Sequence, residues 1–317
     1  MTSAPADVLV IQNPASGRGR PETWRAAIAA GFARLGVRAE IVTTSGPGTA
    51  ATWARRALAA GVRRIVVAGG DGTISDAAEA VAGSPAVLGV LPLGTGNQLA
   101  FHLGIPRSLD AALRIAVCGA VRRLDVGWIR GRAFVAMAGA GLDARVVTKA
   151  SQAAKRRVGI AAYLAAGLAA GLRPTRARIA VRADGDAWEG EGIGVLVANV
   201  PALRVPLLRH GLCVVPGAAP DDGFLDGCAL AIRHPAGLAR ELWHAVRHGP
   251  HSRRDGRRVR YLRGRTLDVE TDPPLPIQLD GDPLGTTPFR ATVTPGALRV
   301  AVPAPAPGRA AGGVPAR

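Results

Sequence analysis

Cysteine and aromatic residues are scarce in this sequence of 317 residues. The three cysteines, Cys118, Cys213 and Cys228, lie far apart, so the sequence has neither a disulfide framework nor a zinc-binding spacing. Aromatic side chains make up only 4% of the chain, so it has few of the stacking platforms that single-strand nucleic-acid binders use. We therefore predict a protein of a reducing compartment that does not bind nucleic acid.

Long hydrophobic runs are also lacking. The most apolar helical stretch, residues 159–172, is shorter than the roughly 18–20 residues that a transmembrane helix needs. Residues 1–7 show no basic region followed by an apolar one, which argues against a secretory signal there. These features predict a cytoplasmic protein that is peripheral at the membrane.

Acidic residues are outnumbered, because 40 Lys and Arg stand against 23 Asp and Glu and give a net charge of +17. Such a surface attracts anions, including phosphates and acidic lipid head groups. Genome base composition alone would also produce this excess of Arg, because the chain is rich in Ala, Gly and Pro. The basic residues at 149–157 and 253–265 suit contact with an anionic membrane surface. A packed helix between the domains is the favoured explanation of the first group, and a solvated loop and strand edge explains the second equally well.

Apolar residues make up 48% of the chain, enough for about two domains. In the first part, short β-branched runs alternate with segments of helical composition, which predicts a parallel sheet covered on both faces, an α/β domain over residues 1–124. The expected strands are 7–12, 38–43, 64–68 and 87–91, and the expected helices are 21–35, 48–60 and 74–82.

Beyond residue 124 the strand-like runs are punctuated by Gly, Pro and Asp, which predicts an antiparallel, β-sandwich-like domain over residues 125–302. The expected strands are 132–138, 176–183, 193–199, 212–215, 225–232, 266–271, 277–279, 289–294 and 297–302, with helical stretches at 143–172 and 235–248. Residues 303–317 lack apolar periodicity and are predicted to form a disordered tail.

A glycine-rich turn, GGDGT at residues 69–73, lies between a predicted strand and a predicted helix. Its glycines let the backbone approach an anion, the helix start offers free N–H groups, and Thr73 adds a hydroxyl. Asp71 is out of place in a plain phosphate cradle, so we infer a cation, most simply Mg²⁺, between its carboxylate and a nucleotide. The alternative is an ordinary strand-to-helix turn, in which Asp-Gly is favoured.

Two further loops follow predicted strands: NPASGR at residues 13–18 and LGTGN at residues 93–97. Each joins small residues to a hydroxyl or amide donor, which suits hydrogen bonding to phosphate or ribose. Ligands of open parallel sheets bind at the carboxyl ends of the strands, so the three loops should converge on one site. The P-loop and Gly-x-Gly-x-x-Gly patterns do not occur at the first strand–helix junction.

In this order and spacing, the three loops resemble the catalytic domain of the diacylglycerol kinase and sphingosine kinase superfamily, particularly its soluble bacterial lipid kinases. The similarity continues through GAGLD at 139–143, DDGFLD at 221–226 and LDGD at 279–282. GGDGT alone is shared with NAD kinases, so a NAD kinase-like or other small-alcohol kinase is one alternative. A homologue that binds nucleotide or membrane without turnover is another.

The resemblance implies MgATP bound between an α/β domain and a β-sandwich, with a lipid hydroxyl, for example of diacylglycerol or a sphingoid base, as the phosphoryl acceptor. It implies Mg²⁺ at the turn of Asp222 and Phe224, and Asp282 as the proton acceptor. The implied partners are a lipid substrate and an anionic membrane surface, and a homodimer is compatible with the sequence. The implied nucleotide-binding residues are Asn13, Pro14, Ser16, Gly17, Thr44, Gly70, Asp71, Gly72, Thr73, Asp76, Thr95 and Asn97.

Phosphoryl transfer requires positioning and charge neutralisation, so one carboxylate aimed at the attacking hydroxyl is sufficient. Asp280 and Asp282 are two residues apart and are expected on one side of a strand, where Asp280 would orient Asp282 or raise its pKa. The same LDGD segment also fits a two-residue hairpin turn, which is compatible with a catalytic role.

The sequence departs from the family pattern at four places. Asp76 and Asp282 stand where most relatives have Glu, and Gln98 replaces an Asp. Residues 200–206 replace a stretch that is often rich in glycine. Each shortened carboxylate reaches about 1.5 Å less far, which matters for positioning. These changes predict either a shifted substrate choice or a weakened activity.

Overall fold

The computed structural model describes residues 6–17, 20–141, 175–204, 211–232, 237–238, 240–241, 243 and 258–304. Several expectations lie outside the described residues: the helical stretch at 143–172, the basic residues 149–157, most of 235–248, residues 253–257 of the basic stretch 253–265, and the tail beyond residue 304. No helix among the described residues is both long enough and apolar enough to cross a membrane.

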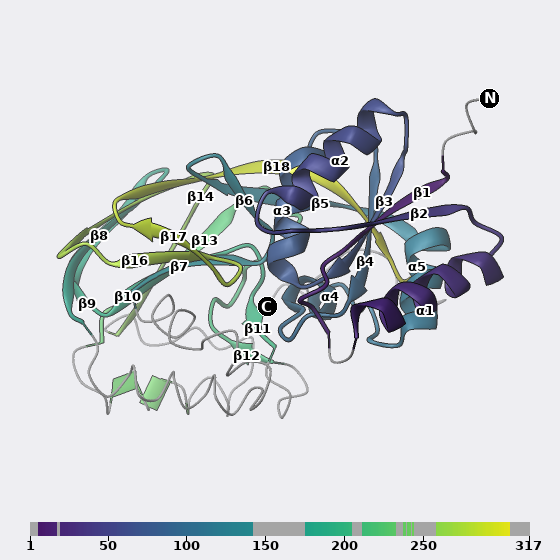
Figure 1. Cartoon of the computed structure of the whole chain (residues 1–317). Helices are drawn as coiled ribbons and strands as arrows, with labels where there is room; N and C mark the ends of the chain where they lie inside the picture. Colours follow the sequence, from purple (N-terminus) through teal and green to yellow (C-terminus); the bar gives the residue numbers. More distant parts are fainter. Residues whose placement is uncertain are drawn as a thin grey trace.

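The first half is a parallel sheet with helices on both faces. Its strands pair in the order β2-β1-β3-β4, all parallel, and α2 and α3 lie on the face opposite to α1 and α5 (Figure 1). The strands are β1 (Val8–Gln12), β2 (Ala39–Thr43), β3 (Arg64–Gly69) and β4 (Val87–Pro92). The helices are α1 (Pro21–Arg34), α2 (Thr49–Ala59), α3 (Asp71–Val81), α4 (Gln98–His102) and α5 (Leu109–Cys118). Because both faces are covered, a central strand such as β1 is buried at every position.

The second half contains an antiparallel sheet of six strands in the order β14-β13-β10-β7-β16-β17. These strands are β7 (Met137–Gly141), β10 (Gly194–Ala198), β13 (Leu225–Leu230), β14 (Val259–Gly264), β16 (Pro276–Leu279) and β17 (Asp282–Thr286). An apolar cluster that includes Val197, Leu225 and Leu267 fills the space between this sheet and the outer part of the larger sheet. A separate two-stranded sheet pairs β11 (Ala202–Leu203) with β12 (Leu212–Cys213).

The larger sheet runs through both halves of the molecule. β18 (Phe289–Val302), the last strand along the sequence, pairs with β15 (Thr266–Asp272) at one end and, in parallel, with β4 at the other (Figure 1). β5 (Ala120–Ile129) pairs with β18 on either side of an irregularity between Thr294 and Leu298. The remaining strands are β6 (Arg132–Phe134), β8 (Ala177–Ala183) and β9 (Asp186–Gly192). The expected domain boundary after residue 124 therefore falls inside β5.

The predicted fold class, a parallel α/β half with an antiparallel β-sandwich-like half, is confirmed. The strands expected separately at 289–294 and 297–302 form one long strand, β18. The run expected at 132–138 is two strands, because the chain turns between β6 and β7 and enters the other sheet.

Candidate active site

The three glycine-rich loops meet at the carboxyl edge of the parallel sheet. Asn13 Nδ2 donates a hydrogen bond to Thr73 Oγ1 at 2.9 Å, which ties the NPASGR loop to GGDGT. The amides of Leu93 and Gly94 both donate to the carbonyl of Gly69 at 3.1 Å, which ties LGTGN to the same turn. The sequence-based expectation that these loops share one edge is therefore met in the structure.

Two of these loops are in direct backbone contact. A Cβ placed on Gly94 would lie 2.5 Å from the Cα of Gly70, and one placed on Gly70 would lie 3.3 Å from the Cα of Gly94. Any side chain at Gly94 would therefore overlap backbone and push the loops apart. The glycines thus form a narrow cradle beside the start of α3, which begins without a side-chain cap.

Asp71 is nearly buried, and it faces the LGTGN loop. Its Oδ2 accepts from the amide of Gln98 at 2.9 Å and its Oδ1 from the amide of Leu99 at 3.1 Å, so the carboxylate holds the first turn of α4. Burial raises the pKa of Asp71, and these amides partly offset the effect. The premise that only a cation could explain this carboxylate is therefore too narrow, and a contact of Asp71 with Mg²⁺ stays a prediction.

The other residues assigned to nucleotide binding differ in how far they are buried. Asn97 is buried, has a left-handed backbone, and donates from Nδ2 to the carbonyls of Pro92 (3.2 Å) and Gly94 (2.7 Å), so it shapes its own loop. Thr44 is buried directly after β2, whereas Thr95 is exposed at the tip of its loop. In the NPASGR loop Pro14 and Ser16 are half-buried and Gly17 is exposed with a φ of 90°.

Asp76 lies on α3 and supports the start of α2. Its Oδ2 accepts from the amide of Ala50 at 2.9 Å, while its Oδ1 is buried without a hydrogen-bond partner. Burial, reinforced by the charge of Glu79, raises the pKa of Asp76. Asp76 thus carries a buried oxygen that no donor among the described residues satisfies at the junction of α3 and α2.

LDGD forms the two-residue turn of the β16–β17 hairpin. Leu279 pairs with Asp282, and the two residues between them have positive φ angles, 45° for Asp280 and 96° for Gly281, as a type I′ turn requires. The expectation that Asp280 and Asp282 lie on one side of a strand is therefore wrong. Asp280 is a turn residue, so the strand alternation does not extend to it.

Asp280 is held by the protein's own donors. Its carboxylate accepts from the amides of Val135 (2.7 Å), Ala136 (3.1 Å) and Met137 (2.8 Å), and from the hydroxyl of Ser75 at 2.5 Å. Burial raises the pKa of Asp280 to about 7, against the lowering effect of Ser75. Asp280 thus joins the hairpin to α3 and to the start of β7.

Asp282 is exposed and lies against the GGDGT turn. A Cβ placed on Gly72 would overlap the carboxylate of Asp282, so this acid of the second half touches the backbone at the start of α3. The residue predicted as proton acceptor and the loop predicted to hold phosphate are therefore neighbours, although 210 positions separate them in the sequence.

Sequence reasoning missed a cation in this neighbourhood. Arg132, on β6, forms an ion pair with Glu79 of α3, and Glu79 also accepts from the amide of Ala133 at 3.2 Å. The hydrogen bond to Glu79 and the charges of Asp76 and Asp282 raise the pKa of Arg132. No local motif marks Arg132, because its partners lie on α3 and β17.

The turn assigned to Mg²⁺ is satisfied by protein groups. Asp222 Oδ1 accepts from the amide of Phe224 at 3.1 Å, and its Oδ2 is paired with Arg263 at 2.7 Å. The guanidinium groups of Arg263 and Arg265 lie 4.7 and 5.7 Å from the Phe224 ring centroid. Within the described part of the chain, no three His, Cys, Asp or Glu residues are arranged to hold a metal. Both carboxylate oxygens of Asp222 thus already have protein partners, and a contact of this turn with Mg²⁺ stays a prediction.

Asp125, which the sequence analysis also missed, lies behind the same turn. This buried carboxylate accepts from the amides of Gly223 (2.6 Å) and Gly296 (2.7 Å), and burial raises its pKa. It joins β5 to the Asp222 turn and to the irregular part of β18. An acid inside an apolar strand was its only sequence signal.

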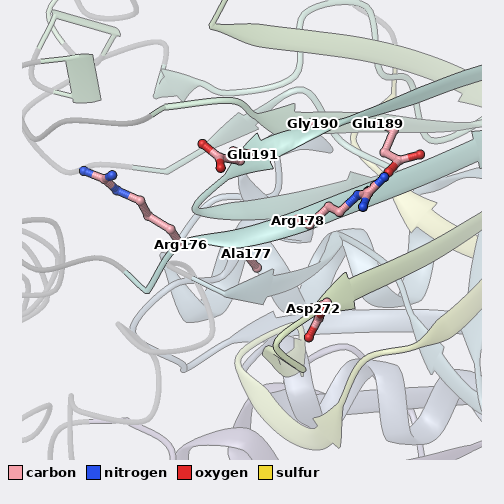
Figure 2. Close-up of a pocket in the computed structure, with 7 residues that line it drawn as sticks. All are labelled: Arg176, Ala177, Arg178, Glu189, Gly190, Glu191 and Asp272. Atoms are coloured by element: carbon pink, nitrogen blue, oxygen red, sulfur yellow. Dashed lines mark hydrogen bonds and ion pairs between the residues drawn. The ribbon is translucent and has the colours of Figure 1, made fainter.

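A shallow groove of about 810 Å³ lies elsewhere, over β8 and β9 (Figure 2). Arg178 and Glu189 form an ion pair in it, and none of the residues assigned to the site lines it. The groove is therefore distinct from the candidate active site.

The fold and the site define a class: a two-part protein whose glycine-rich loops at a parallel sheet edge face an acid carried by a β-sandwich-like half. The family described as "Diacylglycerol kinase catalytic domain" matches residues 7–129, and the "YegS C-terminal NAD kinase beta sandwich-like domain" matches residues 136–302. The chain belongs to the diacylglycerol kinase-like family that combines these two domains. The family identified from the sequence and the expectation of a kinase are therefore confirmed.

Relatives and solved structures agree with this assignment. A "Probable lipid kinase YegS-like" of Pseudomonas aeruginosa is 35% identical over 304 residues, 95% of each chain. A protein of the same name from Pseudomonas fluorescens is 36% identical over 264 residues, 82% of this chain and 84% of that one. The crystal structure of a diacylglycerol kinase from Bacillus anthracis superposes with a TM-score of 0.75 at 23% identity, over 93% of this chain and 96% of that one, which shows a shared fold.

Proposed function

We propose that this enzyme transfers the γ-phosphate of MgATP to the hydroxyl of a lipid, with diacylglycerol or a sphingoid base as the acceptor. The observation that carries the proposal is the contact between Asp282 and the backbone of Gly72. It brings an acid from the second half to the loop whose glycines and helix start suit phosphate. The names of the Pseudomonas relatives support a lipid acceptor.

In this reaction Asp282 is the general base. It accepts the proton of the lipid hydroxyl while the hydroxyl oxygen forms a bond to the γ-phosphorus, and the bond from that phosphorus to the β–γ bridging oxygen breaks, releasing ADP. The magnesium that enters with the nucleotide neutralises phosphate charge. The amides at the start of α3 orient the γ-phosphate, and Arg132 adds a positive charge beside Asp282.

Asp280 acts as a positioning residue in this scheme. It cannot approach a substrate hydroxyl, because its oxygens already accept from Ser75 and three backbone amides. Those bonds fix the turn that precedes Asp282 and hold it against α3. Of the two acids that the sequence analysis assigned to catalysis, Asp282 is therefore the base and Asp280 holds the turn that precedes it.

The net charge of +17 favours contact with an anionic membrane surface, where a lipid acceptor is found. We propose such peripheral contact as the way in which the enzyme reaches its substrate.

The test is to incubate the purified chain with radiolabelled ATP and Mg²⁺ together with dispersed diacylglycerol, a dispersed sphingoid base, NAD or no acceptor. We expect label in a lipid. Label in NAD alone would favour a NAD kinase-like enzyme. The absence of label from every acceptor tested would favour a binding protein without turnover. Either result would contradict the proposal.

A further inference from the structure

Helix α4 is the part of the first half that reaches the β11–β12 sheet of the second half (Figure 1). It begins directly after LGTGN, and Asp71 holds its first amides. Two of its side chains, Gln98 and His102, are four residues apart and so lie on the same face of the helix.

Both side chains bind the backbone of β11 and of the residue that follows it. The amide of Arg204 donates to Gln98 Oε1 at 2.6 Å, and His102 Nε2 lies 2.7 Å from the carbonyl of Ala202. Between them, Phe101 packs against Gly211, where an added Cβ would lie 3.3 Å from the Phe101 ring. The helix thus contacts the region of the β11–β12 sheet through two hydrogen bonds and one apolar contact.

The segment that leads into β11 is hydrogen-bonded to other parts of the second half. The carbonyl of Pro201 accepts from the amides of Val214 and Val215 at 3.0 and 3.1 Å, and the amide of Asn199 donates to the carbonyl of Ala136 at 2.8 Å. This segment follows β10, which lies in the same sheet as the β16–β17 hairpin that carries Asp282. The chain therefore runs directly from the sheet that carries the hairpin into β11.

The backbone amide and the side chain of Gln98 bind two different partners. Its backbone amide donates to Asp71 of GGDGT, and its side-chain oxygen accepts from Arg204 of the second half. An Asp at this position would be a methylene shorter and would bring a second negative charge next to Asp71. The departure at Gln98 and the departure at residues 200–206 are therefore in contact with each other.

We propose that Gln98 and His102 are positioning residues that fasten the β11–β12 sheet to the nucleotide loops, so that nucleotide binding fixes the sheet that carries Asp282. This inference rests on the proposed function for its catalytic consequence. The structural part concerns the hydrogen bond to the Arg204 amide, which can be measured without turnover.

The experiment measures amide exchange of Arg204 in the full chain, with and without a non-hydrolysable ATP analogue and Mg²⁺. We expect exchange to slow when nucleotide binds the wild type. Loss of one hydrogen bond in Gln98→Met should raise exchange about five- to tenfold and abolish the nucleotide effect. Gln98→Glu keeps an acceptor oxygen at the same reach but adds a negative charge near Asp71, so it should restore part of the protection.

The same variants are assayed for turnover. Gln98→Met should lower kcat about three- to tenfold with an unchanged KM for ATP, and Gln98→Glu, which keeps the acceptor oxygen but adds a charge near Asp71, should recover part of it. If Gln98→Met does not fold, His102→Leu and its matched control His102→Gln, which keeps an N–H donor, test the second bond in the same two assays. Arg114→Gln, on the exposed side of α5, should match the wild type throughout.

Unchanged Arg204 exchange in Gln98→Met, or no effect of nucleotide on the wild type, would overturn the inference whatever the activity. If exchange behaves as expected but no lipid is phosphorylated, the fastening stands and the proposed function fails. The two failures are therefore distinguishable.

Discussion

Three acids near the candidate site, Asp71, Asp125 and Asp280, bind backbone amides from segments distant in the sequence. A carboxylate that accepts several amides can remain buried, because those donors replace part of its lost hydration. Each of these acids therefore connects two parts of the fold. Asp282 differs from them because it is exposed and lies at the phosphate-binding turn.

We expect the substitution Asp282→Asn to lower kcat about 10²- to 10⁴-fold, the usual loss when a general base is removed. The KM for ATP and the melting temperature should change little, because the side chain is exposed. Steady-state kinetics and thermal denaturation check this. Asp282→Glu, which keeps the carboxylate, is the matched control and should stay active. Equal kcat in Asn and wild type would remove Asp282 from the mechanism.

For Asp280 we expect a pH-dependent contribution to stability. Its pKa is 3.8 in the absence of the fold and about 7 in the native state, so between these values only the native chain holds the proton. Its contribution to the free energy of unfolding is complete below pH 3.8 and declines as pH rises to about 7, by at most about 1.4 kcal/mol per pH unit.

Asp280→Asn cannot titrate and should remove this slope. Urea denaturation across that pH range should show the stability advantage of the wild type shrinking as pH rises and then becoming constant. A difference that is the same at every pH would contradict the raised pKa.

At the scale of elements, the loops depend on glycines that leave no space between them. We expect Gly94→Ala to destabilise the protein by about 1–3 kcal/mol, because its methyl group would overlap the backbone of Gly70. Nucleotide affinity should fall as well, since the displaced loops no longer form the cradle. Gly46→Ala is the control, because no atom lies within 4 Å of the Cβ it adds. Chemical denaturation and nucleotide titration measure both effects, and equal behaviour of the two variants would refute the contact.

Local pattern also decided which elements were predictable. The strands β1, β3 and β4 are built on apolar runs bounded by turns, so their period and length identify them. β9 (Asp186–Gly192) is an edge strand of acidic residues and glycine around Ala187 and Trp188, with only Gly192 fully buried, and was not predicted. α4 was missed because it has only five residues, and its position depends on Asp71.

At the scale of the whole molecule, β18 makes the two halves one folding unit. It pairs with β15 in the second half and with β4 in the first. We therefore expect a single cooperative unfolding transition. Single-tryptophan variants that keep Trp53, packed on the first core, or Trp188, packed on the second, should report the same midpoint. Two separate midpoints would show that the shared strand does not couple the halves.

The sequence by itself determined the fold class, the family and the three loops, because period, turn residues and motif spacing are local properties of the chain. Only the tertiary structure decided that Asp282 lies at Gly72, that Asp71 and Asp280 bind amides, and that Gln98 contacts Arg204. These contacts join residues that are tens to hundreds of positions apart. Which polar group satisfies a buried carboxylate depends on the strand order and on how the two sheets pack, and neither can be read from a short segment of sequence.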